Sequence, residues 1–461
     1  MATFDPFLGR AAGSLDEIRH RARGRVLVVG LGASGRGALE LLARRGADVR
    51  GYDRTPPADL GIPVFGGETP PPEALERVDL VVLSPGVPPE RVVPAMSFHA
   101  PNARATGEFA LGLAHLFEVR PDVEAFLVTG TNGKSTTTHV LAHLLEASGR
   151  DVFAGGNLGP SLAAHLASDP PRHTYVLEAS SFQLETYPGA PARAAVVTNV
   201  TPDHLDRYPD LAAYAATKAR VFAGMAAGRL AVVGPGLPSP AAPPDDLRRV
   251  EIDPNAVDGP SMRIGTGTTV EVAALRLVGH HNRMNVACAL AVAVDIGVSP
   301  ETCAEALARV EPLPHRCAFV ARIDGVDFYD DSKATNVASA VATLRGLDRT
   351  FVLIAGGRAK PGDDPTPLVD AVAEKGRAAV LVGESAEVLA RHLGRIVPVD
   401  VVPDMDAAVA AARAMAQPGD AVVLAPAAAS YDRYRNFEER GRDFARAVHA
   451  AASHADTPPH P

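Results

Sequence analysis

The sequence predicts an α/β protein built from three consecutive α/β domains, and two observations carry this prediction. Short apolar, β-branched runs alternate with Ala- and Leu-rich segments along almost the whole chain, which is the pattern of parallel sheets covered by helices. At 461 residues the chain is also too long for one ordinary domain. Prolines near 100–105 and 311–314 indicate linkers, so the predicted domains are residues 1–105, 106–312 and 313–461.

Each predicted domain has its own set of strands. In the first domain we expect strands at Arg25–Val29, Val49–Tyr52 and Leu80–Leu83, with a helix after Gly35. The second runs from a strand at Ala125–Thr129 to helices at Asn282–Ile296 and Pro300–Val310. In the third, the expected strands end near Tyr329 or lie at Phe351–Ala355, Ala379–Val382 and Ala421–Leu424. The first 24 residues fit none of these patterns.

Charge and composition exclude several classes of protein. Lys plus Arg number 45 against 54 Asp plus Glu, a net charge of -9, which argues against nucleic acid as a partner. No apolar stretch approaches the roughly 18 residues of a membrane span, and the N-terminus lacks the apolar core of a signal peptide. The three cysteines have no metal-binding spacing. We therefore expect a cytoplasmic protein with no membrane partner.

A glycine-rich segment, Val128–Thr136, follows an apolar strand and precedes a helix, as a phosphate-binding loop does. Its glycines would let backbone N–H groups approach an anion at the helix N-terminus. Lys134 would reach the β- and γ-phosphates, and the Ser135 hydroxyl would ligate Mg²⁺. The full pattern has a glycine where this chain has Val128. The segment favours ATP binding over the alternative, a simple turn with a capping serine.

A second glycine-rich turn, Gly30–Gly35, also follows a strand, and Asp53 ends the next strand. This is the pattern of a Rossmann dinucleotide site, but it indicates only that a phosphate or ribose approaches the backbone. Tight packing without a ligand is the alternative. Ser84–Gly86 closes a third strand at the same sheet edge, where ligands of open α/β sheets bind.

Polar side chains follow two strands next to the phosphate loop. Glu178 ends one predicted strand, and His204 follows the next, Ala194–Val197. Together with the loop, a carboxylate and an imidazole there favour Mg²⁺ ligation over a capping or turn role. Lys218 lies on a predicted helix, Leu211–Gly224, where a lysine is usually solvated.

The motifs in this order resemble the Mur ligase family over residues 25 to 446. The segments that carry the resemblance are GTNGKST, GGNLG, LEASSFQLE, NVTPDHLDRY, GHHNRMN, LPHR, DDSKATN and AAASYDRYRNFEERG. The resemblance implies a Rossmann-like N-terminal domain, a central P-loop ATPase-like domain and a Rossmann-like C-terminal domain. It also implies an ATP-dependent amide ligase that adds D-glutamate to UDP-N-acetylmuramoyl-L-alanine through an acyl phosphate, in peptidoglycan precursor synthesis.

The resemblance further implies a role for each matched residue. The ATP-binding residues would be Gly130, Thr131, Asn132, Gly133, Lys134, Ser135, Thr136, Asn282, Arg316 and Asp331. The UDP-substrate would contact Gly32, Ala33, Ser34, Asp53, Ser84, Pro85, Gly86 and Asn157. D-glutamate would contact Lys333, Thr335, Lys360, Ser430 and Phe437. The catalytic residues would be Lys134, Glu178, His204 and Lys218, and two Mg²⁺ would bind Ser135, Glu178, His204 and Lys218, the last as a carbamate.

Three rival functions stay open at this point. A neighbouring branch, such as folylpolyglutamate synthetase or a sister enzyme adding another amino acid, is disfavoured by the DDSKATN and SSFQLE segments. An NAD-dependent oxidoreductase would leave the phosphate loop without a use. A catalytically inactive nucleotide sensor would not need Lys134, Glu178, His204, Lys218 and Lys333 together. We expect a monomer whose domains close over small-molecule substrates.

Overall fold

The computed structural model describes residues 5, 7, 9–57, 60–265, 267–277, 279–359 and 364–455. The chain divides into two compact units, one made of residues 1–273 and 284–307 and the other of residues 274–283 and 308–461. The first unit contains two parallel sheets and a small ribbon, and the second contains one mixed sheet. The predicted α/β class, with three successive sheets, is confirmed. The predicted boundaries at 105 and 312 stay predictions.

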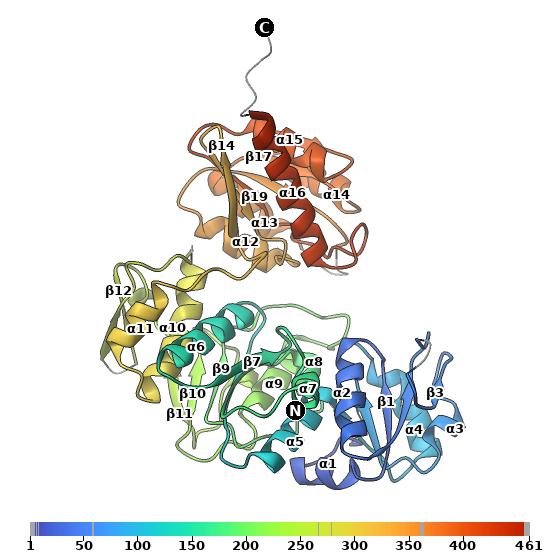
Figure 1. Cartoon of the computed structure of the whole chain (residues 1–461). Helices are drawn as coiled ribbons and strands as arrows, with labels where there is room; N and C mark the ends of the chain where they lie inside the picture. The colour runs from blue at the N-terminus through green and yellow to red at the C-terminus, as the bar shows by residue number, and fades with distance from the viewer. Residues whose placement is uncertain are drawn as a thin grey trace. The chain divides into compact units, whose positions relative to one another are not determined.

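The N-terminal sheet has five parallel strands in the order β3-β2-β1-β4-β5. They are β1 (Arg25–Val29), β2 (Asp48–Tyr52), β3 (Val64–Phe65), β4 (Leu80–Leu83) and β5 (Arg104–Gly107). Helix α2 (Ala33–Arg44) covers one face, and α3 (Pro72–Leu75) and α4 (Val93–His99) cover the other (Figure 1). Burial on both faces explains why β1 and β4 read as continuous apolar runs.

The residues before β1 extend this sheet and its core. Ala11 forms a parallel bridge with Ala105 of β5, and the Phe7 side chain is buried in the apolar cluster under the sheet. Helix α1 (Leu15–Arg21) begins at Ser14, whose hydroxyl caps the Glu17 amide, and packs on α5. The N-terminal segment that no sequence pattern explained therefore completes the edge of the first sheet.

The central sheet has six parallel strands in the order β11-β10-β9-β6-β8-β7. They are β6 (Glu124–Thr129), β7 (Val152–Gly156), β8 (Thr174–Glu178), β9 (Ala194–Val197), β10 (Leu230–Val233) and β11 (Arg248–Glu251). The accompanying helices are α5 (Glu108–Val119), α6 (Lys134–Ala147), α7 (Leu162–Ser168), α8 (Ser181–Leu184) and α9 (Leu211–Ala219). Side chains of α5 and α7 share one apolar cluster with both the first and the central sheet, which makes the two sheets one compact unit.

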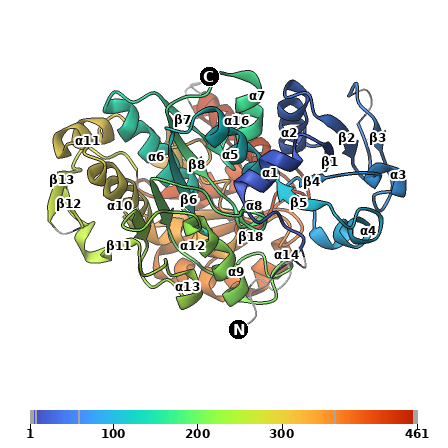
Figure 2. The same cartoon turned by 90° about the horizontal axis from the view of Figure 1, so that it is seen from below.

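A two-stranded antiparallel ribbon, β12 (Ser261–Ile264) and β13 (Thr268–Glu271), packs against α11 (Pro300–Leu307), beside α10 (His280–Asp295) (Figure 2). Single 3₁₀ turns lie at η1 (Pro89–Arg91), η2 (Arg220–Phe222), η3 (Ser239–Ala241) and η4 (Pro254–Ala256). The helix predicted at 211–224 is shorter than expected. It ends as α9 at Ala219 and tightens into η2, after which Ala223 is extended and Gly224 takes a left-handed conformation against Gly189 and Ala190.

The sheet of the second unit has the order β14-β15-β19-β16-β17-β18, parallel except for the β14–β15 pair. Its strands are β14 (Ala318–Ile323), β15 (Val326–Asp330), β16 (Phe351–Ala355), β17 (Gly376–Leu381), β18 (Val399–Val401) and β19 (Ala421–Leu424). Helices α12 (Val337–Gly346), α13 (Thr366–Lys375) and α14 (Ala386–Leu393) pack on one face. Helices α15 (Met405–Met415) and α16 (Phe437–Ala455) pack on the other (Figure 1). None of the helices in the described ranges is long and apolar enough to cross a membrane.

Candidate active site

The loop between β6 and α6 has the backbone shape of an anion-binding loop. Gly130 and Gly133 have φ of +146° and +81°, and α6 begins at Lys134 directly after them. A Cβ on Gly130 would lie 2.0 Å from Thr198 Oγ1, and one on Gly133 would lie 2.0 Å from Asn285 Oδ1. Only glycine fits at either position, so the loop can bring its amides to the N-terminus of α6.

The segment after β9 holds this loop in place. Asn132 N donates to Asn199 Oδ1 over 3.0 Å, and Asn199 Nδ2 donates back to the Asn132 carbonyl oxygen over 3.0 Å. Thr198 Oγ1 donates to the same carbonyl oxygen over 2.6 Å. Thr131 and Thr201 are joined by two further bonds between side chain and backbone. The NVT segment therefore fixes the geometry of the loop from the neighbouring strand.

Two lysines lie at this loop. Lys134 Nζ donates to the carbonyl oxygens of Gly130 and Thr131, over 2.9 and 2.7 Å. Lys218 Nζ donates to the Gly130 carbonyl oxygen over 2.7 Å and lies 4.4 Å from the centre of the Tyr214 ring. The Lys218 side chain is 1 % exposed, so the solvated position that its helix alone suggested is wrong. Burial, followed by the Lys134 charge, lowers the pKa of Lys218 well below its usual value.

Glu178, at the end of β8, is 1 % exposed. Its Oε1 accepts a bond from Asn157 Nδ2 over 2.6 Å, whereas its buried Oε2 has no hydrogen-bond partner in the structure. Glu178 also acts electrostatically on Lys218, as does Asp203. An unsatisfied buried carboxylate oxygen next to a phosphate loop is a suitable ligand for a hard cation, so these residues fit Mg²⁺.

His204 has a left-handed backbone, with φ of +55°, which is uncommon for a residue other than glycine. Its amide donates to Asp203 Oδ1 over 2.9 Å, and its ring meets the Phe182 ring edge-on at 4.7 Å. Such strained residues cluster at functional sites. In the part of the chain that the structure describes, no three His, Cys, Asp or Glu side chains form a metal-binding group. Any metal here therefore needs further oxygen ligands, such as a hydroxyl, a carbamate or phosphate.

A pocket of about 550 Å³ lies at the carboxyl ends of β1 and β4 and reaches the central sheet at β7. We call it the glycine-turn pocket; it is lined by Gly30, Gly32, Ala33, Ser34, Ser84, Pro85, Gly86, Val87, Gly156, Asn157, Gly159, Pro160, Ser161, Ala164 and Gln183. Its volume is within the range of small-molecule sites. The structure thus brings together all the residues predicted to contact the UDP-substrate except Asp53.

Asp53 instead holds the turn itself. Its Oδ2 accepts the Leu31 amide over 2.7 Å, and its Oδ1 accepts the Thr55 amide over 3.2 Å. Ser84 Oγ donates to the Gly30 carbonyl oxygen over 2.6 Å, which joins the two walls of the pocket. A direct contact from Asp53 to a ligand stays a prediction.

In the second unit, four of the five residues predicted to bind the amino acid lie on three segments joined by Arg440. The Arg440 side chain donates to Ser332 Oγ and to the carbonyl oxygens of Ser332 and Ala428, over 3.0, 2.8 and 3.1 Å. Ser332 Oγ donates to the Phe437 carbonyl oxygen over 2.8 Å. Burial lowers the pKa of Arg440 only to about 10, so its charge persists.

The four predicted residues on these segments are Lys333, Thr335, Ser430 and Phe437. Lys333 Nζ is 3.8 Å from the centre of the Phe437 ring, a cation–π contact. Thr335 N donates to the Lys333 carbonyl oxygen over 2.8 Å, and Ser430 is 3 % exposed. Lys360 lies outside the described residues.

The predicted nucleotide-binding residues Asn282, Arg316 and Asp331 also belong to the second unit. Asp331 is buried and accepts bonds from Thr343 Oγ1 over 2.5 Å and from Cys317 N over 3.2 Å. Burial raises the pKa of Asp331 to about 7, against the opposing effects of the Thr343 bond and the Arg316 charge.

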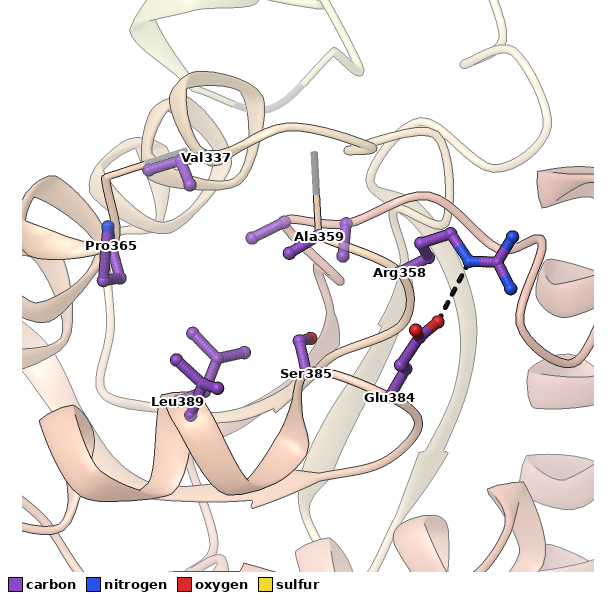
Figure 3. A pocket seen from close by; sticks show the side chains of 10 residues that line it. Val337, Arg358, Ala359, Pro365, Glu384, Ser385 and Leu389 are labelled. Carbon is purple, nitrogen blue, oxygen red and sulfur yellow. Dashed lines mark hydrogen bonds and ion pairs between the residues drawn. The ribbon is translucent and has the colours of Figure 1, made fainter. Parts of the chain in front are cut away.

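A second pocket, of about 230 Å³, lies at the carboxyl ends of β16 and β17 (Figure 3). Its walls are mostly apolar, and the Arg358 guanidinium points away from it toward Glu384, to which it donates over 2.9 Å. Lys333, Thr335, Ser430 and Phe437 are not among the residues that line it.

Known proteins are similar to this chain over most of its length. Residues 128–238 match the Mur ligase middle domain, and residues 315–428 match the Mur ligase glutamate ligase domain. UDP-N-acetylmuramoylalanine--D-glutamate ligase from Aromatoleum aromaticum is 41 % identical over 92 % of this chain and 96 % of its own length. The enzyme of that name from Dechloromonas aromatica is 39 % identical, over 93 % and 99 %. The chain belongs to the Mur ligase family.

A solved structure shows the same fold. The MurF ligase from Thermotoga maritima, in complex with ADP, aligns with a TM-score of 0.58 at 17 % identity, covering 97 % of this chain and all of its own. As in the sequence-based prediction, three α/β sheets follow one another in this Mur ligase chain.

Several residues of this Mur ligase site were not singled out from the sequence. Asn285 lies one helical turn after Asn282, and its backbone oxygen accepts a bond from Thr137 Oγ1 over 3.3 Å. Gln183 lines the glycine-turn pocket and caps α8 through Ser180. Arg440 joins the segments of the second unit. All three lie inside motifs quoted for the resemblance, so those motifs were the signal that could have identified them.

Proposed function

We propose that this chain is an ATP-dependent ligase that adds D-glutamate to UDP-N-acetylmuramoyl-L-alanine, releasing ADP and phosphate, in cytoplasmic peptidoglycan precursor synthesis. The observation that carries the proposal is the bond between Asn157 and Glu178. Asn157 lines the glycine-turn pocket, and Glu178 lies beside the phosphate loop. A substrate whose UDP end fills the pocket can thus present its carboxylate next to the γ-phosphate of ATP.

The reaction needs an activated carboxylate, because hydroxide is a poor leaving group. The substrate carboxylate attacks the γ-phosphorus of ATP in line, and ADP departs, leaving an acyl phosphate. Lys134 begins α6 at the phosphate loop, where its ammonium balances charge on the transferring phosphoryl group. The amine of D-glutamate then attacks the acyl carbon, and phosphate departs as the amide forms.

Magnesium would be held by the Ser135 hydroxyl, Glu178, His204 and Lys218 as a carbamate. Bound Mg²⁺ supplies charge neutralisation and orientation of phosphate oxygens. The lowered pKa of Lys218 supports the carbamate, because only a neutral amine adds to carbon dioxide. The unsatisfied Oε2 of Glu178 supports its role as a ligand.

The second unit would hold the amino acid. Lys333 offers a cation for a carboxylate, and Thr335 and Ser430 offer hydroxyl groups, with Lys360 as a further predicted cation. Arg440 keeps these segments together without contacting substrate. Asn282, Arg316 and Asp331 would contact the nucleotide. We expect the enzyme to act as a monomer.

The test is phosphate release by the purified protein with ATP, Mg²⁺ and UDP-N-acetylmuramoyl-L-alanine. Release should depend on D-glutamate and be far slower with L-glutamate or without an amino acid. Lys134→Ala should lower turnover by at least about a hundredfold while leaving calorimetric binding of the UDP-substrate nearly unchanged. Release that is independent of the UDP-substrate, or normal activity of the variant, would contradict the proposal.

A further inference from the structure

Two charged residues near the ends of two of the quoted motifs are largely shielded from water, yet they have no part in the reaction above. Glu185 ends the LEASSFQLE segment, and Arg207 lies in NVTPDHLDRY. Their side chains are 1 % and 12 % exposed. Arg207 Nε donates to Glu185 Oε1 over 3.1 Å, and Arg207 Nη2 donates to Glu185 Oε2 over 2.5 Å. Tyr208 Oη also donates to Glu185 Oε1, over 2.8 Å.

Such a pair adds little to stability, because removing two charges from water costs about as much as their attraction returns. Its geometry is more informative than its energy. A bidentate arginine fixes both the direction and the distance of a carboxylate, which a lysine does not. The other groups that Arg207 contacts indicate what this ion pair positions.

The Arg207 guanidinium has two further contacts, one on each side of the active site. Its carbon lies 4.7 Å from the centre of the Phe182 ring, and that ring meets the His204 ring edge-on at 4.7 Å. Arg207 Nη2 also reaches the Val87 carbonyl oxygen at 3.5 Å, and Val87 lines the glycine-turn pocket. One side chain thus contacts both the support of His204 and the wall of the pocket.

Helix α8 lies between these contacts and cannot hold its own position. It has only four residues, Ser181–Leu184, and a single helical turn is marginal without tertiary contacts. Its start is fixed by the capping box of Ser180 and Gln183, and Gln183 also lines the pocket. Its end is Glu185, which Arg207 and Tyr208 hold.

We propose that Arg207 is a positioning residue that holds Glu185, Phe182 and Val87, and so fixes the distance between the glycine-turn pocket and the His204 side of the phosphate loop. The substrate must span this distance to bring its carboxylate to ATP, so the inference rests on the proposed function. Loss of the bidentate contact therefore loosens the alignment of the UDP-substrate with ATP while leaving the ATP loop itself intact.

The experiment compares Arg207→Lys with Arg249→Lys. Arg249 has the same kind of partner, Glu251, at 2.7 Å, but both side chains are about half exposed. For each protein, the thermal midpoint, the Kd for ADP, and kcat and KM for the UDP-substrate are measured. Arg207→Lys should keep the midpoint and the Kd of the wild-type protein, while kcat/KM for the UDP-substrate falls about ten- to a hundredfold. Arg249→Lys should match the wild type throughout.

A double variant tests whether Arg207 acts through Glu185. Arg207→Lys with Glu185→Gln should lose no more kcat/KM than the worse of the two single variants, because both substitutions remove one shared contact. The inference would be overturned if Arg207→Lys kept the kcat/KM of the wild type. It would also be overturned if the fall in kcat/KM came with a matching loss of ADP affinity and a lower thermal midpoint. A wild-type protein without UDP-substrate-dependent phosphate release would instead overturn the proposed function.

Discussion

Lys218 Nζ donates to the Gly130 carbonyl oxygen over 2.7 Å, so a buried amine lies directly against the phosphate-binding loop. A lysine with 1 % exposure keeps its charge only at a considerable cost in solvation. The Lys134 charge adds to this cost, and Asp203 and Glu178 reduce it. This environment favours the neutral amine at pH values where an ordinary lysine is charged.

The neutral amine predicts a carbamate on Lys218. We expect protein equilibrated with ¹³C-bicarbonate to show a carbamate signal by NMR that weakens as the pH falls, because protonation removes the nucleophile. Dialysis against carbon-dioxide-free buffer should lower turnover, and bicarbonate should restore it. Lys218→Ala should lack both the signal and the response, whereas Lys375→Ala, which removes a lysine bonded to the Leu347 carbonyl oxygen, should keep both. A signal that persists in Lys218→Ala would contradict this assignment.

The bond between Asn157 and Glu178 predicts a large loss of activity for Asn157→Asp, although this substitution hardly changes the size of the side chain. Asn157→Asp keeps the size of the side chain but replaces the donor, 2.6 Å from Glu178 Oε1, with a second carboxylate. Like charges at this distance force one group to bind a proton or move away. We expect kcat to fall by about a hundredfold, and further than in Asn157→Ala. Steady-state phosphate release measures both variants, and an Asn157→Asp enzyme faster than Asn157→Ala would show that the bond does not orient Glu178.

The positions of the central strands β1, β4, β9, β16 and β19 followed from the sequence, because these strands are buried on both faces and are mostly apolar. Edge strands such as β3, β11 and β18 were not predicted, because they are short or partly exposed. The ends of helices were predicted less accurately from the sequence. The α9 region leaves the helical conformation before Gly224, which lies against Gly189, a residue distant along the chain that left no local pattern.

The site was predictable where chemistry depends on local backbone shape, as at Gly130 and Gly133. It was not predictable where a side chain gains its role from a distant partner. Lys218 has the helical context of a solvated lysine, and only the packing of Tyr214 and the loop buries it. Asp53 matched a ribose-binding pattern but holds the Leu31 amide, because a carboxylate at a strand end can bond to a neighbouring turn as readily as to a ligand.

Asp331 predicts a pH dependence of nucleotide binding. Because burial raises its pKa to about 7, the carboxyl is ionised above that pH and neutral below it. If Asp331 contacts the nucleotide as a carboxylate, KM for ATP should rise as the pH falls through about 7. The Thr343 hydroxyl favours the ionised form, so Thr343→Val should raise the pKa and move the rise in KM to higher pH. Thr302→Val on α11 is the matched control, and an identical pH profile in Thr343→Val would exclude Asp331 as the titrating group.

Glu108 predicts how stability changes with pH. It begins α5, is 1 % exposed, and its Oε1 accepts the Ala163 amide at the start of α7 over 2.7 Å. Burial raises its pKa from 4.5 to about 7. The folded state therefore binds a proton at Glu108 more tightly than the unfolded state. The stability of the fold that depends on this protonated carboxyl is fully present below pH 4.5 and is lost as the pH rises through about 7.

Glu108→Gln should remove this loss, because the amide keeps the acceptor for Ala163 and carries no charge. The quantity to compare is the free energy of unfolding of the variant minus that of the wild type. This difference should be larger at about pH 8 than at about pH 5, by up to about 3 kcal/mol. Any constant cost of the amide cancels in this comparison. Urea unfolding at the two pH values measures it, with the exposed Glu146→Gln as the control. Equal differences at both pH values would mean that Glu108 titrates normally and that its carboxylate is solvated when ionised.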